Sequence, residues 1–141
     1  RVAVLAAVET VHPNMPATLD AAALCKMADR GQIEGAIIDG PLAFDNAVSP
    51  EAAERKGIRS AVAGRADILI VPDIEAGNMM AKQLFYLAAA QSAGLVMGAR
   101  VPIMLTSRAD GRLSRLASAA AALLVARRQK SMRAAKQDSP A

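Results

Sequence analysis

The chain has 141 residues, enough for one domain of ordinary size, and 53% of them are apolar, which supports a sizeable core. With two Phe, one Tyr and no Trp, few aromatic side chains could stack on nucleic-acid bases. One Cys excludes an intramolecular disulfide, and together with one His it argues against a dedicated zinc site. Cys25, within AALCKMA, is more typical of a core side chain than of a nucleophile, and His12 is interpreted as an exposed loop residue.

The formal net charge of +4 arises at the C-terminal end. Residues 1–107 hold nine basic and eleven acidic side chains, whereas residues 108–141 hold eight basic and two acidic ones. Much of the excess lies in RRQKSMRAAKQDSPA, residues 127–141. We expect this segment to be a basic, disordered tail rather than a nucleic-acid-binding arm.

The first half of the chain alternates apolar runs with helix signals. VAVLAAV predicts a strand buried on both faces. A helix should follow, with Thr18 as its N-cap and Gly31 as its stop. GAIIDG predicts a second strand, Ala36–Asp39, and Ser49 and Gly57 then mark the start and end of a short helix.

The second half continues the alternation. ADILIV, GLVMG and VPIML each predict a strand. Helices are expected from about Asn78 to Ser92 and from about Arg112 to Arg127. Strands alternating with helices indicate an α/β sandwich with a mainly parallel sheet.

Polar turns follow three of the predicted strands. In parallel sheets, ligands bind at the carboxyl ends of strands, where the free N–H groups of the next helix favour anions. The turn after the second strand is DGPLAFDNA, and its Asp39 could orient a ligand or merely cap a turn.

The next polar turn is PDIEAGN. Gly77 would let the backbone approach a neighbouring group closely, and Asn78 is expected to cap the following helix. Asp73 and Glu75 place two carboxylates beside a strand end, where they repel each other unless they are paired or solvated. The turn matches neither a Walker loop nor a GxGxxG sequence, so its spacing alone indicates no nucleotide site.

The last polar turn contains Thr106, Ser107, Arg108 and Asp110. Arg108 suits a phosphate because its guanidinium group donates two parallel hydrogen bonds and keeps its charge. Ser107 adds a hydroxyl group that can donate and accept. Since a surface Arg after a strand is common, this turn leaves a phosphate site and a solvated surface both open.

Four long strings agree at once with one known family. They are AVETVHPNMPATLDA, DGPLAFDNAVS, AGRADILIVPDIEAGNMMAKQL and GARVPIMLTSRAD, in this order. The chain up to about Ala126 therefore resembles the phosphate acetyl/butyryl transferase family, and within it the transacylase part of bifunctional enoyl-CoA hydratase/phosphate acetyltransferases. The resemblance implies a three-layer α/β sandwich, similar to isocitrate and isopropylmalate dehydrogenases. Residues 1–126 would form its C-terminal part.

The resemblance also implies reversible transfer of an acetyl or butyryl group between coenzyme A and inorganic phosphate. The Ser–Arg pair of the family's active-site cleft carries over onto Ser107 and Arg108. An Asp proposed as the base in family acetyl transferases would fall near Ser114, and Asp110 is the closer acid, so Asp110 is the third predicted catalytic residue. Further phosphate-binding arginines belong to an N-terminal part of the family fold, so we expect this chain to be inactive alone. The predicted substrate-binding residues are Asp39, Asp73, Glu75, Gly77, Asn78 and Thr106.

We expect no cofactor and no metal, because phosphate can attack a thioester without either when both substrates are held in attack geometry. The expected partners are a coenzyme A thioester and inorganic phosphate as substrates, and further copies of the chain in a cytoplasmic homo-oligomer. A membrane or nucleic-acid partner is not expected. The alternative is a non-catalytic coenzyme A-binding or assembly module derived from the same family.

Overall fold

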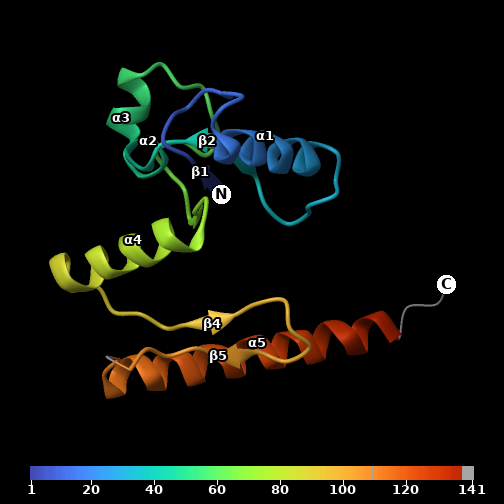
Figure 1. The fold of residues 1–141 in the computed structure, drawn as a ribbon. Coiled ribbons are helices and arrows are strands. Elements are labelled where there is room, and N and C mark those ends of the chain that lie inside the picture. The colour runs from blue at the N-terminus through green and yellow to red at the C-terminus, as the bar shows by residue number, and fades with distance from the viewer. Residues whose placement is uncertain (109, 138–141) are drawn as a thin grey trace. The chain divides into compact units, whose positions relative to one another are not determined.

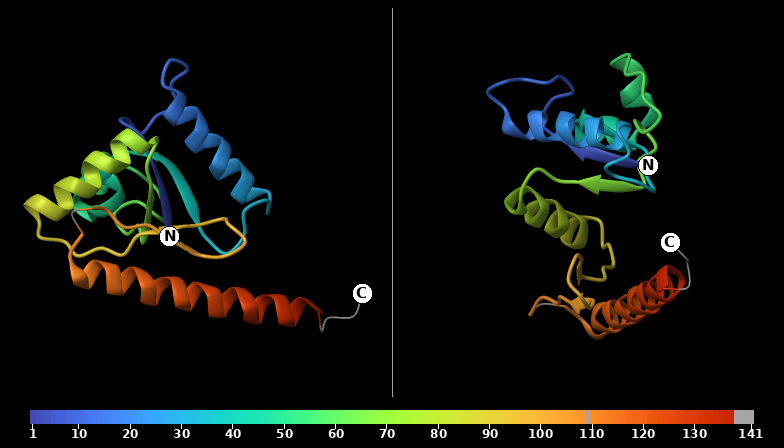
Figure 2. Two further views of the ribbon diagram at one scale, coloured as in Figure 1. Left: turned by 60° about the horizontal axis from the view of Figure 1, so that its bottom comes forward. Right: turned by 90° about the vertical axis from the view of Figure 1, so that its right-hand side faces the viewer.

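The computed structural model describes the backbone of residues 1–108 and 110–137, and side chains as far as Met132. The chain divides into two compact units, Arg1–Ala81 and Lys82–Ala141 (Figure 1, Figure 2). The length of the chain predicted one domain, so this division is a finding of the structure.

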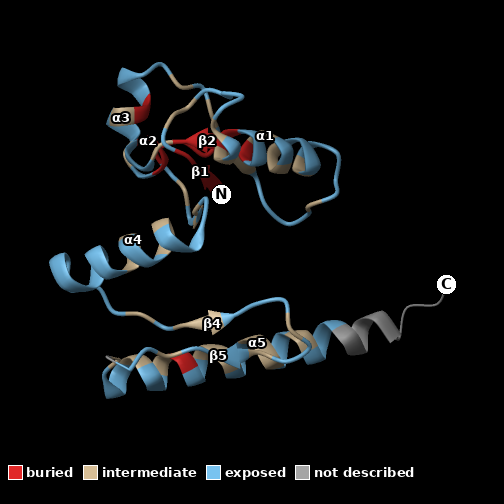
Figure 3. Cartoon of the chain, in the orientation of Figure 1, coloured by how far each residue is buried: buried red, intermediate tan, exposed pale blue. Residues whose placement is uncertain are grey.

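The first unit is built on a parallel sheet. Its three strands are β1 (Val2–Leu5), β2 (Ile38–Leu42) and β3 (Ile68–Ile70), in the order β2-β1-β3. Both neighbours of β1 run parallel to it. Every residue of β1 is buried, as expected for a central strand covered on both faces (Figure 3). The prediction of an α/β fold with a mainly parallel sheet is confirmed.

Helices cover the two faces of this sheet. A Cβ on Gly40 would contact the side chains of Val4 and Ala21, so α1 (Pro16–Asp29) packs on the face that carries Val4. Alternate residues of a strand point to opposite faces. Ala3 therefore points the other way, into a core cluster that includes residues of α2 (Phe44–Val48) and α3 (Pro50–Arg55).

The start of α1 differs from the prediction. Met15 is the N-cap and Pro16 the first helical residue, a position where the missing N–H of proline costs nothing. Thr18 is buried inside the helix, and its Oγ1 accepts the N–H of His12 at 2.9 Å. The predicted cap is thus wrong, because the Thr18 hydroxyl bonds back to the preceding loop. Gly31 follows the helix with φ of +71°, as the predicted stop requires.

The second strand lies further along the chain than predicted, because it begins at Ile38 instead of Ala36. It continues through Gly40 and Pro41 to Leu42, whose carbonyl accepts the N–H of Ala6 at 3.0 Å. Asp39 therefore lies inside β2 rather than in a turn after it. The Asp-Gly-Pro sequence resembles a turn, but Gly40 lies so close to β1 that an added Cβ would be 2.6 Å from the Val4 carbonyl oxygen.

The signals of the short helix are confirmed. The Ser49 hydroxyl caps α3 by accepting the N–H of Ala52 at 3.3 Å. Pro50 begins the helix, and Gly57 follows its end with φ of +65°. These positions could be predicted because a cap, a proline and a glycine act within a few residues.

Helix α4 (Ile74–Leu87) begins earlier than predicted. The Asp73 Oδ1 accepts the N–H of Ala76 at 2.7 Å, which is the hydrogen bond of an N-cap. Asn78 is therefore an interior helical residue, and its predicted capping role is wrong. The helix ends at Leu87 instead of Ser92, because Ala89 adopts φ of +50° and the chain leaves the helical path there.

The second unit holds an antiparallel pair of short strands, β4 (Leu95–Val96) and β5 (Ile103–Met104). The sequence predicted both strands correctly but placed them in the parallel sheet. They pair with each other because the chain reverses between them, through Gly98 with φ of +89°. Among the described residues of this unit, only Ser118 is buried (Figure 3).

Helix α5 (Arg112–Gln137) packs against this strand pair. The sequence placed its end near Arg127, but ten further residues rich in Ala, Arg, Lys and Gln continue it, with no Gly or Pro to stop it. Residues 138–141, the end of the predicted disordered tail, lie outside the described residues. The proposed division of the chain at residue 126 stays a prediction. No helix in the described part of the chain is long and apolar enough to cross a membrane.

Candidate functional site

The turn after β5 brings two predicted catalytic residues into direct contact. The Asp110 Oδ2 accepts the backbone N–H of Ser107 at 2.6 Å. In return, the N–H of Asp110 donates to the Ser107 carbonyl at 3.1 Å. The Arg115 Nε then donates to the Asp110 carbonyl at 3.2 Å. These bonds fix the turn and join it to the first residues of α5.

The other two predicted residues of this turn differ in exposure. Arg108 is exposed and Thr106 is half-buried. An exposed guanidinium group at a fixed turn can meet an anion with two parallel N–H groups. Arg108 therefore presents its guanidinium group from a turn that is held by the hydrogen bonds between Ser107 and Asp110.

Segment 88–94 is held against β5 and α5 by a glycine and a serine that the sequence interpretation missed. The buried Ser118 Oγ accepts the N–H of Gly94 at 3.0 Å and donates to the Ser114 carbonyl at 2.7 Å. Gly94 also accepts the N–H of Leu105 at 3.0 Å, and an added Cβ there would lie 2.2 Å from the Leu105 carbonyl oxygen. Because Leu105 directly precedes Thr106, these contacts set the position at which the turn begins.

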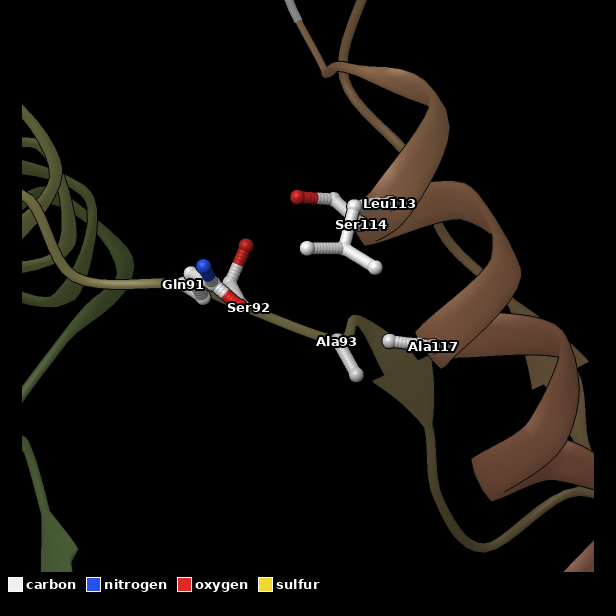
Figure 4. Close-up of a pocket in the computed structure, with 6 residues that line it drawn as sticks. All are labelled: Gln91, Ser92, Ala93, Leu113, Ser114 and Ala117. Atoms are coloured by element: carbon white, nitrogen blue, oxygen red, sulfur yellow. The ribbon is translucent and has the colours of Figure 1, made fainter.

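A pocket of about 220 Å³ lies beside the first turns of α5. Figure 4 shows segment 91–93 on one side and α5 on the other. Ser114, which lies near the spacing of the family's proposed base, is one of its lining residues. The full lining consists of Gln91, Ser92, Ala93, Leu113, Ser114 and Ala117.

In the first unit, Asp39 has a local role. Its Oδ1 accepts the N–H of the next residue, Gly40, at 2.8 Å. Asp39 also lies opposite Ala3 in the parallel ladder and is half-buried. Asp39 thus makes a local hydrogen bond within β2 rather than capping a turn, and its predicted contact with substrate stays a prediction.

The residues of the PDIEAGN turn form the start of α4. Asp73 caps this helix, Glu75 lies in its first turn, and both carboxylates are exposed, so solvent relieves their repulsion. A Cβ on Gly77 would lie 2.9 Å from a methyl group of Val71. The glycine thus permits a close approach within the protein, and Asn78 is exposed on the helix surface. Roles of these four residues in substrate binding stay predictions.

A polar cluster that sequence reasoning missed joins the loop after β1 to α2 and α3. The Glu9 Oε1 accepts from the Asn46 Nδ2 and from the Lys56 Nζ, the latter at 2.6 Å. Asp45 lies 3.5 Å from the same ammonium group. The hydrogen bond that Lys56 donates to Glu9 holds the pKa of Glu9 below its usual value, and the same bond raises the pKa of Lys56. Asn46 belongs to the polar turn DGPLAFDNA, whereas Glu9 follows the first apolar strand, and this position is the signal that could have identified it.

The remaining candidates for metal or thiol chemistry are few. Burial is the main reason why the pKa of the Cys25 thiol is raised, which disfavours the thiolate form. The His12 Nδ1 accepts the N–H of Asn14 at 3.2 Å, within an exposed loop. Within the described residues, no group of His, Cys, Asp and Glu could hold a metal ion.

Comparison with known proteins identifies the family. The family model described as phosphate acetyl/butaryl transferase matches residues 1–123. The chain belongs to this family. It is similar to a phosphate acetyltransferase of Rhizobium meliloti, with 62% identity over 135 residues, covering 96% of this chain and 43% of that protein. It is also similar to a phosphate butyryltransferase of Clostridium beijerinckii, with 52% identity over 130 residues, covering 92% of this chain and 43% of that protein.

Solved structures agree with this assignment. A branched-chain phosphotransacylase from Enterococcus faecalis matches with a TM-score of 0.74 and 36% identity, over 86% of this chain and 44% of that one. The EutD phosphotransacetylase from Staphylococcus aureus matches with a TM-score of 0.69 and 26% identity, over 86% of this chain and 39% of that one. The chain therefore spans less than half the length of these family members.

Proposed function

We propose that this chain is part of a phosphate acyltransferase, which reversibly transfers an acetyl or butyryl group between coenzyme A and inorganic phosphate. The observation that carries the proposal is the family match over residues 1–123, together with relatives named phosphate acetyltransferase and phosphate butyryltransferase. Coenzyme A and phosphate are then substrates, and the proposal needs no resident cofactor or metal. Because these substrates are intracellular metabolites, we place the protein in the cytoplasm.

The turn after β5 supplies the residues for the chemistry. An oxygen of phosphate attacks the thioester carbonyl carbon, the carbonyl oxygen becomes negatively charged, and the coenzyme A sulfur then leaves and takes up a proton. Arg108 binds the phosphate and offsets the negative charge that develops. Ser107 donates a hydrogen bond from its hydroxyl group to the carbonyl oxygen or to the leaving sulfur. Thr106, at the start of the turn, is a further substrate-binding candidate.

Asp110 has two candidate roles that can be separated. As a carboxylate it could exchange the proton of the coenzyme A thiol, and as the acceptor of the Ser107 N–H it holds the turn in place. Asn keeps an oxygen that accepts this N–H but cannot act as a base. Asp110→Asn should therefore remove activity if the proton transfer matters and preserve most of it if Asp110 only positions the turn. Asp110→Ala should remove activity in either case.

The complete active site needs more than this chain offers. The 220 Å³ pocket is smaller than the about 300–1,000 Å³ of pockets that enclose a drug-sized ligand, and coenzyme A is larger still. We propose that the chain contributes one part of a three-layer sandwich of the isocitrate/isopropylmalate dehydrogenase type. Its remaining active-site residues would come from the part of family members that this chain does not span. Assembly of several copies belongs to the same proposal.

A second candidate is a non-catalytic module that binds coenzyme A or supports assembly. This alternative is considered because much of the second unit is exposed: among its described residues, only Ser118 is buried. Isothermal titration with coenzyme A and with acetyl phosphate separates binding from assembly. No heat with either ligand would favour an assembly module.

The test of the proposal is a chimera in which residues 1–123 replace the matching part of the Rhizobium meliloti phosphate acetyltransferase. Release of coenzyme A from acetyl-CoA and butyryl-CoA is followed with and without phosphate. Arg108→Ala should lower turnover by about 100-fold or more, and Arg108→Lys should also be strongly impaired, because Lys lacks the planar fork. Arg59→Ala is the control, since Arg59 is also exposed but lies outside the turn. A near-normal rate for Arg108→Ala would remove Arg108 from the mechanism.

A further inference from the structure

The loop between β1 and α1, residues 6–15, is tied to other elements at three places. At its start, the N–H of Ala6 donates to the Leu42 carbonyl of β2 at 3.0 Å. Near its end, the N–H of His12 donates to the Thr18 Oγ1 of α1 at 2.9 Å. Between these points lies Glu9, whose carboxylate reaches two other elements.

The contacts of Glu9 cross long stretches of sequence. Its Oε1 accepts from Asn46 of α2, 37 residues away, and from Lys56 at the end of α3, 47 residues away. The side chains of Glu9 and Lys56 are 26% and 45% exposed, so the ion pair lies at the surface and can be reached by water. An ion pair of this exposure is weak by itself and can be released by salt or by a competing charge.

Asn46, which bonds to Glu9 of this pair, is fully buried. Its Nδ2 bonds to Glu9, but its Oδ1 is buried with no hydrogen-bond partner among the described residues. A buried acceptor without a donor raises the free energy of the state that buries it. Opening of the loop would let water reach this oxygen, so part of the cost of breaking the Glu9 contacts would be recovered.

We propose that Glu9 is a latch, which holds the β1–α1 loop closed over α2 and α3, and that release of Glu9 lets this loop open while the sheet stays folded. The closed state has the Glu9 contacts but buries the Asn46 oxygen, whereas the open state loses those contacts and hydrates the oxygen. Because hydration of the Asn46 oxygen offsets part of the cost of losing the Glu9 contacts, the free energies of the two states lie close together, as a two-state element requires. The loop leaves the carboxyl end of β1, the edge at which ligands reach parallel sheets, so its opening exposes that edge.

The test is NMR relaxation of the backbone amides of residues 7–11 in the whole chain. A closed loop should have order parameters of about 0.85, and Glu9→Ala, which removes the oxygen that accepts from Asn46 and Lys56, should lower them to below about 0.6 while β1 and α1 are unchanged. Lys56→Met removes one of the two contacts and should lower them less. Because both substitutions act on one latch, the double variant should be no more mobile than Glu9→Ala.

A matched control is Glu51→Gln, which removes the exposed ion pair between Glu51 and Arg55 on α3 without touching the latch. It should leave the loop unchanged. If Glu9→Ala does not fold, the same amides are measured in the unsubstituted chain as sodium chloride is raised to about 1 M, where the screening length is about 3 Å. The loop should then become mobile before the sheet does. Order parameters that stay unchanged in Glu9→Ala and at high salt, or that fall equally in loop and sheet, would overturn the latch.

Discussion

Replacement of Gly94 by Ala should destabilise the second unit. A Cβ at this position would lie 2.2 Å from the Leu105 carbonyl oxygen, whereas ordinary contacts begin at 3.4 Å, so the backbone must move by about 1 Å. Inserting a methyl group into a space already filled costs about 1–3 kcal/mol. The same movement weakens the 3.0 Å hydrogen bond from the Leu105 N–H to Gly94, worth about 0.5–1.5 kcal/mol. Together these terms predict a loss of about 1.5–4.5 kcal/mol.

The assay is urea unfolding followed by far-ultraviolet circular dichroism, with Gly111→Ala as the control. Gly111 has no heavy atom within 4 Å of an added Cβ, so Gly111→Ala creates no clash and should lower the free energy of unfolding by less than Gly94→Ala does. If Gly94→Ala were as stable as Gly111→Ala, the close approach of Gly94 to Leu105 would not be present in solution. The claim that this contact positions the following turn would then fail.

Three further predictions concern single hydrogen-bonding groups. Because its bond with Lys56 keeps the pKa of Glu9 low, the stability that Glu9 contributes should be complete above about pH 5 and lost as the pH falls through the lowered pKa. The difference in unfolding free energy between the chain and Glu9→Gln should therefore shrink from about pH 7 to about pH 3, and a constant difference would contradict this. Asp73→Ala should cost about 0.5–2 kcal/mol in urea unfolding as a lost helix cap, whereas Asn78→Ala should cost nothing; the reverse order would restore Asn78 as the cap. Ser118→Ala should cost about 1–3 kcal/mol in the same assay, because the buried hydroxyl that bonds to the Gly94 N–H and the Ser114 carbonyl is lost, and an unchanged midpoint would count against that arrangement.

The elements that could be predicted are those defined by local sequence. Apolar runs located the strands, and Gly31, Ser49 and Gly57 marked helix ends because each acts within a few residues. The wrong caps, Thr18 and Asn78, have a common cause. Both helices begin before the predicted cap: α1 starts at Met15 and Pro16 without a side-chain cap, and Asp73 caps α4.

The features that could not be predicted from the sequence depend on contacts between residues that are distant in the chain. GLVMG and VPIML are equally apolar whether they join a parallel sheet or pair with each other, so their partner could not be predicted. The same holds for Asp39, which continues β2 because Gly40 packs against β1. At the candidate site, the strand-end rule located Ser107 and Arg108, but the contact of Asp110 with the Ser107 backbone required the structure.

The most direct test of the proposed function compares phosphate-dependent release of coenzyme A by this chain alone and by the chimera with the Rhizobium meliloti phosphate acetyltransferase. Positioning of both substrates supplies most of the rate in a reaction without covalent catalysis, and a partial cleft cannot position them. We therefore expect turnover comparable with the parent enzyme in the chimera and none above background in the chain alone. Full turnover by the chain alone would contradict the shared active site, and an inactive but folded chimera would contradict the assignment as a phosphate acyltransferase.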